Sequence, residues 1–570
     1  MVNLTINKKP VSVPEGTSII DAARSNGIGI PSLCYFKGLN EIGACRVCAV
    51  EIEKKDKLVP ACNTPVEEGM AVFTNSPKAR EARRTNVELI LSQHDCLCAK
   101  CARSGNCALQ TVANDLNIIG AEYEPDIPEA DWPADFPLIR SESKCIKCMR
   151  CVQTCDKIQN LQVWDVINTG SRTTVGVKRR CSIEKANCSL CGQCITHCPT
   201  GALRERDDTD KVFAALADPD KITIVQIAPA IRTAWCEAFG LSREEGTVER
   251  LAACLRRVGF DYVFDTTFSA DLTITEEASE FIGRFTKGGL AELPMFTSCC
   301  PGWVRFVKSE YPELLPQLSS AKSPQQMFGA AAKTWFAKRN NIDPHRIFNV
   351  SIMPCLAKKF ECSGLGMNDA CGDPDVDVVL TNREVTRLLR MESIDPRQVE
   401  PEPCDMPLGI GTGAGEIFGA TGGVMEAALR SAYFYITGEN PPPDAFKDVR
   451  GMDGWKESAY KAGEVNVRVA VVNGLANARR LIEALLAKKV SYDFVEVMAC
   501  PGGCVGGGGQ PVREACEMAP ERFQTLYDLD KKNALRFSHE NPSVIAAYSE
   551  YFEKPNSHAA HKLLHIEHKL

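Results

Sequence analysis

The sequence predicts a large α/β domain with parallel sheets flanked by helices, preceded by three small cysteine-rich modules. Three observations predict this arrangement. The chain has 570 residues, which is enough for three or four domains. Of its 28 cysteines, 17 lie between Cys34 and Cys198. After residue 205 the cysteine density falls, and apolar strand candidates alternate with helical stretches.

Composition excludes several classes of protein. Hydrophobic residues make up 44% and charged residues 24% of the chain, which is ordinary for a globular protein and unlike a disordered or fibrous one. The net charge is −7 without a long basic run, so we expect no nucleic-acid partner. There is no apolar run of transmembrane length and no signal-peptide core, so we expect no membrane insertion and a cytoplasmic location. Cysteines stay reduced there and serve as metal ligands more often than as disulfides.

The first module is expected over residues 1–78. Apolar residues alternate with polar ones at 2–6 and again at 11–13, which predicts a hairpin. Thr17 or Ser18 can cap a following helix, and Gly27 can end it. A hairpin followed by a helix indicates a β-grasp module.

Three further domains complete the predicted organisation. Residues 79–123 look helical and charged around a cysteine-rich loop. Residues 124–208 follow, with a linker rich in proline and acidic residues at 123–138. Residues 209–570 form the α/β domain, with strand candidates at 222–227, 347–353, 467–472 and 494–498 and a helix candidate at 247–255.

The strongest local pattern is a doubled C-x2-C-x2-C-x3-C run, at residues 145–155 and 188–198. It matches the bacterial-ferredoxin spacing, in which the fourth cysteine of each block serves the other cluster. A pair of zinc ribbons is the alternative, but the rhythm occurs twice and favours iron and sulfur. One [4Fe-4S] cluster is therefore assigned to Cys145, Cys148, Cys151 and Cys198, and the other to Cys155, Cys188, Cys191 and Cys194.

Four cysteines follow the predicted hairpin and helix: Cys34, Cys45, Cys48 and Cys62. Their position behind the β-grasp elements favours a [2Fe-2S] cluster, although the spacing is not the plant-type one. A structural zinc site with four thiolates remains the alternative.

Next comes a group of one histidine and three cysteines: His94, Cys98, Cys101 and Cys107. A neutral imidazole can complete a four-ligand site when only three thiolates are present, which predicts a third accessory [4Fe-4S] cluster. Cys96 could compete with His94, and zinc could occupy the same ligands. Because the neighbouring groups look redox-active, we interpret the four groups together as an electron relay.

The α/β domain carries three compact cysteine motifs: TSCCPGW at 297–303, MPCLAKK at 353–359 and MACPGGC at 498–504, the last followed by glycines 506–509. Each follows a strand candidate, so we expect them to gather at one end of a sheet, where α/β proteins build their sites. Cys300, Cys355, Cys500 and Cys504 are enough to hold a further cubane, which leaves Cys299 spare.

At these motifs the sequence resembles the iron-only, or [FeFe], hydrogenases, and the resemblance covers essentially the whole chain. In that family the motifs hold the H-cluster, a [4Fe-4S] cubane joined through one cysteine sulfur to a two-iron unit with CO, cyanide and a bridging dithiolate. The resemblance implies that Cys300, Cys355, Cys500 and Cys504 are the cubane ligands, with Cys504 in the bridging position. It also implies reversible hydrogen metabolism, 2H⁺ + 2e⁻ ⇌ H₂.

The resemblance assigns proton delivery to Cys299, whose thiol can accept and release a proton near neutral pH. Glu277, Glu280, Ser319 and Arg284 look like the rest of the family's proton relay. Glutamates three residues apart are neighbours on a helix face. From the spacing alone, the alternative is a solvated helix face with a surface Glu/Arg pair.

Other positions match residues that surround the two-iron unit in the family. Lys358 can donate to a cyanide nitrogen. Some members have serine where Ala230 stands. The hydrogen bond that such a serine side chain makes to cyanide is not expected here. For Met353 and Phe418, plain core packing is the alternative. The positions are Ala228, Pro229, Ala230 and Gln325, similar to cyanide- or carbonyl-contacting residues, and Met353, Phe418 and Met498, similar to apolar packing residues.

Partners are predicted from the same resemblance. The front third is similar to iron-sulfur subunits of NADH-dehydrogenase-like complexes, so ferredoxin or NAD(P)H-linked flavoprotein subunits are the expected electron partners. No G-x-G-x-x-G turn stands between a strand and a helix, so a nicotinamide would bind a partner subunit. Maturation proteins would supply the two-iron unit.

One other function remains beside the enzyme. Iron-sulfur assembly factors related to the family keep the four cubane cysteines without evolving hydrogen. Cys299, the pair Glu277 and Glu280, and Lys358 argue against that function. Separately, the last 13 residues hold His558, His561, His565 and His568, which we interpret as the polar face of a terminal helix.

Overall fold

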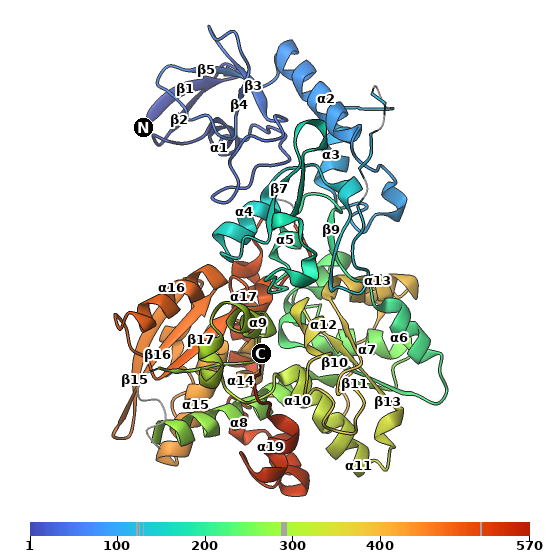
Figure 1. Cartoon of the computed structure of the whole chain (residues 1–570), viewed down its shortest axis with the longest axis vertical. Coiled ribbons are helices and arrows are strands. Elements are labelled where there is room, and N and C mark those ends of the chain that lie inside the picture. Colours follow the sequence, from blue (N-terminus) through green and yellow to red (C-terminus); the bar gives the residue numbers. More distant parts are fainter. Residues whose placement is uncertain (121–122, 125, 129, 287–292, 514–515, 570) are drawn as a thin grey trace.

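The structure is a computed structural model that describes residues 1–570 except 121–122, 125, 129, 287–292, 514–515 and 570. The cysteine-rich front third stands above the α/β part in Figure 1, with the amino-terminal sheet farthest from it. The 145–198 region lies between the two and meets the α/β part through α4 and α5. The modules therefore follow one another in space as they do along the chain.

The amino-terminal module is a five-stranded sheet with the order β2-β1-β5-β3-β4. Strands β1 and β2 form the predicted antiparallel hairpin, and β1 pairs with β5 in parallel. The predicted helix is confirmed as α1 (Ile19–Arg24), and the Ser18 side chain caps it by accepting from the Asp21 amide. The strands are β1 (Val2–Ile6), β2 (Lys9–Val13), β3 (Ala49–Ile52), β4 (Val59–Pro60) and β5 (Ala71–Phe73).

The second module consists of α2 (Pro77–Leu91) and α3 (Ala108–Asp115) around a loop. Ser76 caps α2 by accepting from the Ala79 amide. The module is attached to the next one at residues 199–201. There the Ala108 amide donates to the Pro199 carbonyl at 3.0 Å, and a Cβ on Gly201 would come within 2.5 Å of the Cys101 sulfur.

The third module pairs two short antiparallel ribbons with two short helices. Strand β6 (Leu138–Arg140) pairs with β9 (Leu203–Glu205), and β7 (Trp164–Ile167) pairs with β8 (Thr174–Val177). Helices α4 (Arg150–Lys157) and α5 (Gln193–Thr196) each begin after a residue in the left-handed region, Met149 and Gly192.

The α/β part contains two four-stranded sheets. The first has the order β11-β10-β13-β14 and is parallel throughout. The second has the order β12-β17-β16-β15, in which only β15 runs antiparallel. All four strand candidates are confirmed. The strands are β10 (Ile222–Ile227), β11 (Tyr262–Asp265), β13 (Ile347–Ile352) and β14 (Val378–Leu380), then β12 (Met295–Phe296), β15 (Trp455–Ala462), β16 (Val465–Asn473) and β17 (Phe494–Met498).

Helices cover both faces of the first sheet, because its strands alternate apolar side chains between two cores. In β10, Val225 and Ile227 pack with Leu251 of α7, while Ile224 packs on the other face with Phe268 of α8 and Phe328 of α10. The predicted helix is α7, capped by Thr247 and ended by Gly259 at φ 117°. The main helices are α6 (Thr209–Leu216), α7 (Val248–Val258), α8 (Thr266–Thr286), α9 (Pro301–Glu310), α10 (Pro324–Ala331), α12 (Ala357–Glu361), α13 (Asn382–Met391), α14 (Gly413–Glu416), α15 (Gly423–Thr437), α16 (Leu475–Leu486) and α17 (Ala519–Lys532).

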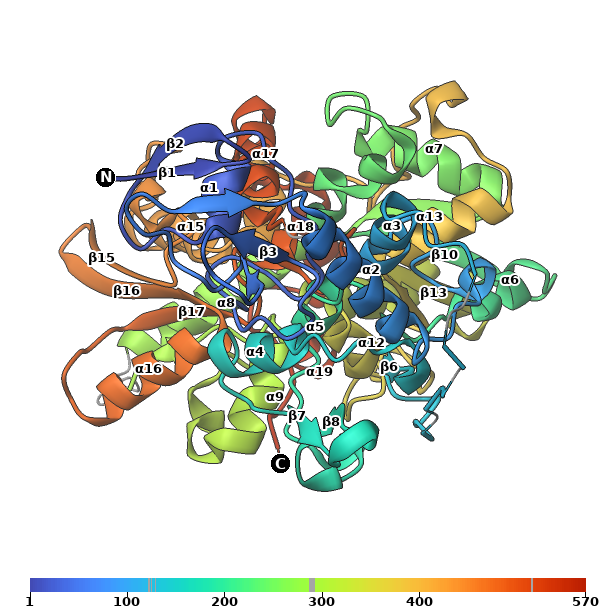
Figure 2. The same cartoon turned by 90° about the horizontal axis from the view of Figure 1, so that it is seen from above.

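The expectation that the three cysteine motifs gather at the end of one sheet is wrong. Cys299 and Cys300 follow β12 and Cys500 follows β17, both in the second sheet, whereas Cys355 follows β13 in the first. The two sheets lie on opposite sides of the molecule in Figure 2, and the carboxyl ends of their strands supply the motifs from either side. The site is therefore built between two sheets.

The carboxyl-terminal segment packs against α8 and the loop before α10. It comprises α18 (Pro542–Ala547), a π-helical turn η16 (Tyr548–Phe552) and α19 (His558–Leu564). Ala321 and His565 form an isolated antiparallel bridge, and the Lys322 amide donates to the Leu564 carbonyl at 2.8 Å. Among the described residues, none of the helices has the length and apolar character needed to span a membrane.

Candidate active site

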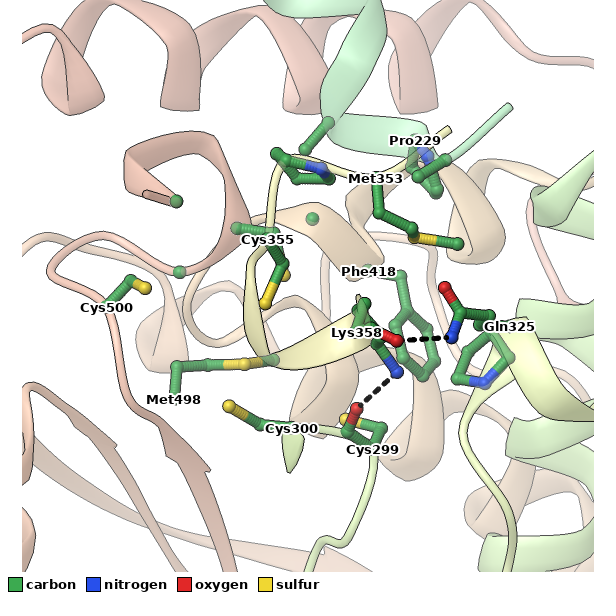
Figure 3. Close-up of a pocket in the computed structure, with 18 of the residues that line it drawn as sticks. Pro229, Cys299, Cys300, Gln325, Met353, Cys355, Lys358, Phe418, Met498 and Cys500 are labelled. Atoms are coloured by element: carbon green, nitrogen blue, oxygen red, sulfur yellow. Dashed lines mark hydrogen bonds between the residues drawn. The ribbon is translucent and has the colours of Figure 1, made fainter. Parts of the chain in front are cut away.

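A buried cavity lies between the two sheets, and Figure 3 shows residues that line it. Cys300 and Cys500 approach it from the second sheet, and Cys355 with Lys358 from the first. Thr266, Ala270 and the prolines Pro301, Pro324 and Pro354 also line it. All thirteen predicted residues of the cubane and its surroundings line it, namely Ala228, Pro229, Ala230, Cys299, Cys300, Gln325, Met353, Cys355, Lys358, Phe418, Met498, Cys500 and Cys504.

The chemistry of the four predicted ligands fits an iron-sulfur cubane. Cys300, Cys355, Cys500 and Cys504 lie close enough for their charges to interact. Burial, reinforced by neighbouring thiols, raises the pKa of Cys355 to about 11 and that of Cys500 and Cys504 further. Buried thiols so close to one another cannot ionise together unless positive charge is placed among them. A metal cluster supplies that charge.

Glycine is required where the 498–509 segment wraps around the cavity. Gly503 has φ 88°, and a Cβ there would meet the Thr421 amide nitrogen at 2.6 Å. A Cβ on Gly507 would lie 2.2 Å from the Pro354 carbonyl oxygen, next to Cys355. The glycine run therefore allows the backbone of the Cys504 segment to contact the backbone of the Cys355 motif directly.

The same run brings the third module against the cavity. A Cβ on Gly508 would lie 2.4 Å from the Gly192 Cα atom and 2.5 Å from the Cys191 carbonyl oxygen. The Cys500 sulfur lies 3.7 Å from that carbonyl oxygen. Cys191, a predicted cluster ligand in the third module, thus contacts Cys500, a predicted cubane ligand in the cavity.

The structure groups the cysteines of the third module in the crossed order that the spacing predicts. One cavity is lined by Cys145, Cys148, Cys151 and Cys198. The other four thiols interact with one another instead: Cys155, Cys188, Cys191 and Cys194. Burial is the main reason that their pKa values are raised.

The first-module cysteines also lie together. Cys34 contacts Cys45 and Cys62, and Cys48 contacts Cys62. Asn40 joins this group to the third module, because its side-chain amide donates to the Cys34 carbonyl at 2.6 Å and to the Cys148 carbonyl at 3.0 Å.

His94 is buried, and its Nδ1 atom has no hydrogen-bond partner among the described residues. Burial, together with the Lys144 charge, lowers the pKa of His94 to about 4, so the imidazole is neutral at neutral pH. A buried neutral imidazole with an unpaired nitrogen fits a metal ligand. Cys96 is exposed, whereas the other three cysteines of the group are partly buried.

Lys358 reaches the cavity from the start of α12. Its ammonium donates to the Cys299 carbonyl at 3.2 Å (Figure 3). It also forms an ion pair with Glu361 at 3.0 Å. Burial lowers the Lys358 pKa, but the charge of Glu361 outweighs that effect and the pKa is raised. Glu361 was not predicted; its i, i+3 spacing from Lys358 is the signal that could have revealed it. The Gln325 amide donates to the same Glu361 carboxylate at 3.0 Å, and its oxygen has no partner among the described residues.

Glu277 lies near Cys299 and is fully buried in α8. Burial, with a smaller contribution from the charge of Glu280, raises its pKa to about 8. Ser319 and the Ser298 amide stand beside it, yet neither carboxyl oxygen makes a hydrogen bond of normal geometry to a described residue. The solvated helix face weighed for Glu277 and Glu280 is therefore wrong, because Glu277 has no exposure to water.

Glu280 is bound by several donors. Ser319 Oγ donates to Oε2 at 2.8 Å, Ser320 Oγ donates to Oε1 at 3.0 Å, and Arg284 donates to Oε1 at 2.6 Å. Arg284 also donates to the Leu318 carbonyl. The predicted relay residues are thus connected from Arg284 to Ser319, while Glu277 and Cys299 are neighbours without a direct hydrogen bond among the described contacts.

The interpretation of the last histidines as a polar helix face is wrong for His565. His565 follows the end of α19, is 5% exposed, and lies between Ser320 and Glu276. No local pattern could have revealed this contact, because the hydrogen-bonded residues are far apart in the sequence.

Comparisons with known proteins agree with this arrangement. The family model "Iron only hydrogenase large subunit, C-terminal domain" matches residues 221–508, and "Iron hydrogenase small subunit" matches 517–569. Models of a 2Fe-2S cluster domain, an NADH-ubiquinone oxidoreductase-G iron-sulfur region and a 4Fe-4S dicluster domain match 1–77, 83–120 and 144–202.

Among curated proteins, the chain is 45% identical to the NADP-reducing hydrogenase subunit HndD of Solidesulfovibrio fructosivorans, over 100% of this chain and 99% of that one. It is 38% identical to iron hydrogenase 1 of Clostridium pasteurianum, over 100% of both chains. Among solved structures, it resembles a single-residue variant of apo [FeFe]-hydrogenase HydA1 from Chlamydomonas reinhardtii, with 42% identity and a TM-score of 0.56, covering 63% of this chain and 98% of that one.

The chain is also similar to proteins of the alternative function. It is 32% identical to cytosolic iron-sulfur assembly component 3 of Pongo abelii, over 68% of this chain and 84% of that one. That likeness is lower in identity and leaves about a third of the chain unmatched.

Proposed function

The chain belongs to the iron-only hydrogenase family, and from this premise we propose that it interconverts protons and dihydrogen, 2H⁺ + 2e⁻ ⇌ H₂, at the cavity between the two sheets. Cys300, Cys355, Cys500 and Cys504 would hold the cubane of the H-cluster, with Cys504 joining it to the two-iron unit. When bound, that unit supplies an open metal site carrying CO, cyanide and a bridging dithiolate, at which dihydrogen is formed or cleaved.

Electrons reach the cavity through the front third in this proposal. One [2Fe-2S] cluster and three accessory [4Fe-4S] clusters are held by the four cysteine groups. The contact between Cys191 and Cys500 supports the last transfer, and the Asn40 bridge between the Cys34 and Cys148 carbonyls supports an earlier one. Tunnelling needs proximity rather than movement, which these packed contacts supply.

Protons reach the cavity from the other side. Cys299 is a proton carrier because its thiol is buried beside Glu277 and is not needed as a ligand. Glu277, which burial keeps protonated around neutral pH, is the next carrier. Its unpaired carboxyl oxygens mark the place where ordered water would complete the link to Cys299. Ser319 passes the proton to and from Glu280.

The remaining cavity residues orient the cofactor and exclude water. The ion pair with Glu361 holds the Lys358 ammonium at the Cys299 carbonyl, where it can also donate to a cyanide nitrogen. Ala228, Pro229, Ala230 and Gln325 would contact the diatomic ligands. Met353, Phe418 and Met498 form the apolar wall, and low polarity there strengthens every charge interaction inside.

We propose that the electron partner is nucleotide-linked. The relative HndD is named as a subunit of an NADP-reducing hydrogenase, and its match extends over the whole of this chain, including the front third. The nicotinamide would bind a flavoprotein partner, and ferredoxin is the alternative electron partner. A cytoplasmic location suits 28 cysteines that must stay reduced. Maturation proteins would install the two-iron unit.

The observation that carries this proposal is the meeting of four cysteines from three motifs at one cavity, with a fifth thiol, Cys299, left over beside them. Infrared spectroscopy of the matured protein tests it. Bands from metal-bound CO and cyanide, together with hydrogen evolution from a chemical reductant, are expected. A chain that binds iron and sulfide under the same maturation but shows neither signal would be an assembly factor.

A further inference from the structure

Glu280 is bound by two serines, and the second one leads away from the catalytic cavity. Ser320 Oγ donates to Glu280 Oε1 at 3.0 Å and lies 2.8 Å from Nδ1 of His565. The other ring nitrogen, Nε2, lies 3.0 Å from Glu276 Oε2. The imidazole of His565 is therefore one hydroxyl group away from the carboxylate at the outer end of the relay.

Arg284, the other group on Glu280, cannot supply protons. A guanidinium keeps its protons at any pH at which the protein is folded, so it has none to exchange. Arg284 donates to Glu280, to the Leu318 carbonyl and to the Pro316 carbonyl. These contacts fix the carboxylate in place, which makes Arg284 a positioning residue. The relay needs a different group that titrates near neutral pH.

The contacts of Glu276 decide which nitrogen of His565 faces the relay. Glu276 accepts from the Tyr548 hydroxyl at 2.6 Å and from the Asn556 amide at 2.7 Å, so it acts as a hydrogen-bond acceptor. Nε2 of His565 is then the N–H donor to Glu276, and Nδ1 is the nitrogen that gains and loses a proton toward Ser320. The His561 ring stacks on the His565 ring, with centroids 4.0 Å apart, and restrains its plane.

His565 also borders water. It lines a cavity of about 400 Å³ together with Leu365, Glu567 and Lys569. Leu365 is 85% exposed, and the side chains of Glu567 and Lys569 are 78% and 68% exposed, so the cavity opens to solvent. His565 is thus a buried histidine that borders a solvent cavity and lies one hydroxyl group from a relay carboxylate, which is the placement of a proton entry point.

We propose that His565 exchanges protons between this solvent cavity and Glu280, through the Ser320 hydroxyl; the inference rests on the proposed hydrogenase function. Protonated His565 gives its Nδ1 proton to Ser320 Oγ, while Ser320 gives its own hydroxyl proton to Glu280. The products are neutral His565, an unchanged serine and protonated Glu280, so one proton has moved and charge is conserved. The hydroxyl then rotates back toward Glu280, and cavity water returns a proton to Nδ1 when the imidazole ring turns that nitrogen away from Ser320.

The surroundings of His565 contain charges of both signs. The nearest are the two carboxylates of α8, and Lys322 across the cavity is already bound by Asp369 and Asp375 at 2.9 and 3.4 Å. The titratable and charged groups that face His565 or share its cavity are Glu276, Glu280, Tyr548, His561, Arg305, Lys308, Lys322, Glu361, Asp369, Glu567, His568 and Lys569.

The test compares His565→Gln with His558→Gln in the full, matured chain. Glutamine can keep hydrogen bonds to Ser320 and Glu276 but cannot carry a proton. Hydrogen evolution should fall roughly tenfold or more in His565→Gln, with an altered pH profile. Iron content and infrared bands should match the wild type. His558 is exposed at the start of α19, the helix that His565 follows, so His558→Gln should behave as wild type. A His565→Gln chain with wild-type turnover across the pH range would overturn the proposal.

Two further measurements separate proton transfer from a structural role. Added imidazole should restore at least part of the turnover of His565→Ala, because the shortened side chain leaves room beside Ser320; a lack of rescue contradicts the proposal. If His565 variants lose iron, Ser320→Ala replaces them. It breaks the bridge while leaving the pair of His565 and Glu276 intact, and wild-type turnover in that variant also overturns the proposal.

A readout without turnover is available in the chain that lacks its two-iron unit. Difference infrared spectra of histidine-labelled protein between about pH 5 and pH 8 should contain an imidazole signal that shifts in Glu276→Gln and disappears in His565→Gln. If no imidazole signal disappears in His565→Gln, His565 does not titrate and the proposal is wrong. A wild-type chain that evolves no hydrogen would contradict the proposed function instead, while this titration would still decide whether His565 gains and loses a proton.

Discussion

The electron side and the proton side of the catalytic cavity are built on different principles. On the electron side, backbone meets backbone at Gly192 and Gly508, and a carbonyl of one cysteine lies 3.7 Å from the sulfur of another. On the proton side, the groups are ionisable side chains, from unpaired Glu277 to Glu280 with its several donors among the described residues. Electrons need only proximity, whereas protons need titratable groups that are joined by hydrogen bonds, directly or through hydroxyl groups and water. Substitutions on the electron side should therefore impair electron transfer, and substitutions on the proton side should impair proton transfer.

The largest effect is expected at the junction of the two sides. Cys500→Ser removes a thiolate that holds the cubane, and serine is a poor substitute because its hydroxyl does not ionise near neutral pH. Iron content of the matured chain should fall by about six atoms, four from the cubane and two from the unit joined to it, and hydrogen evolution should vanish. Iron analysis measures the first effect and a hydrogen-evolution assay the second, while infrared spectroscopy shows whether the CO and cyanide bands are lost.

Cys181→Ser is the matched control for that loss. Cys181 is exposed and belongs to none of the predicted ligand groups. Its replacement should leave iron content and turnover unchanged. If Cys500→Ser retains the full iron content, the assignment of the cavity cysteines is wrong.

Cys299→Ser should separate the two sides most clearly. Cys299 is a proton carrier in our proposal and not a ligand, so iron content should stay nearly intact while turnover falls by roughly 10²- to 10⁴-fold. Reduction of the accessory clusters by dithionite should remain normal, as measured by electron paramagnetic resonance. Unchanged hydrogen evolution would remove Cys299 from the relay.

The same contrast explains how much could be predicted from the sequence. Cluster ligands follow fixed spacings, so the crossed assignment of Cys198 and Cys155 could be made from the chain alone. The cavity residues came from a resemblance carried by three motifs. The strands were predictable because apolar runs mark them, but their division into two sheets was not, since pairing depends on contacts between distant segments.

The proton side was the least predictable part. Ser320 and His565 are 245 residues apart, and the histidine spacing at 558–568 predicts a helix face rather than a contact with Ser320. A hydrogen bond between such residues follows only from the complete fold, which docks the carboxyl-terminal segment onto the loop before α10. Glu361 was missed for a simpler reason, because an i, i+3 Lys/Glu pair is common on solvated helices and does not by itself indicate a buried ion pair.

A smaller effect is expected on the electron side from Gly508→Ala. The new Cβ would lie 2.4 Å from the Gly192 Cα atom, so the third module must move away from the cavity. Tunnelling rates fall steeply with distance, and turnover driven through the front clusters should drop several-fold at unchanged iron content. Turnover with a small reductant that reaches the cubane directly should drop less.

Gly29→Ala provides the control for Gly508→Ala. A Cβ on Gly29 meets nothing within 4 Å, and its φ lies outside the left-handed region. It should leave both activities unchanged. Equal loss of turnover with both reductants in Gly508→Ala would mean that the substitution damages the cavity itself rather than the electron contact.

The smallest effect concerns stability on the proton side. Burial raises the pKa of Glu277 from the ordinary value of 4.5 to about 8. Below pH 4.5 the folded and unfolded chains are both protonated here. As the pH rises toward 8, the unfolded chain releases this proton while the folded chain retains it, so the free energy of unfolding falls. Glu277→Gln removes this titration and should unfold at a higher temperature than the wild type near pH 8, with a difference that shrinks toward pH 5.

The loss in free energy of unfolding is a few kcal/mol at most. A difference of one between the pKa values of the folded and unfolded chains corresponds to about 1.4 kcal/mol, and water entry would make this difference smaller. Thermal unfolding followed by fluorescence at several pH values measures it, with iron content checked at each pH. The exposed Glu392 supplies the control, since Glu392→Gln should shift the unfolding temperature equally at all pH values. A constant difference between Glu277→Gln and the wild type would mean that Glu277 is ionised in the folded chain. Glu277 would then be a base that must take up a proton before Cys299 can receive one. Each cycle would start with Glu277 deprotonated rather than protonated.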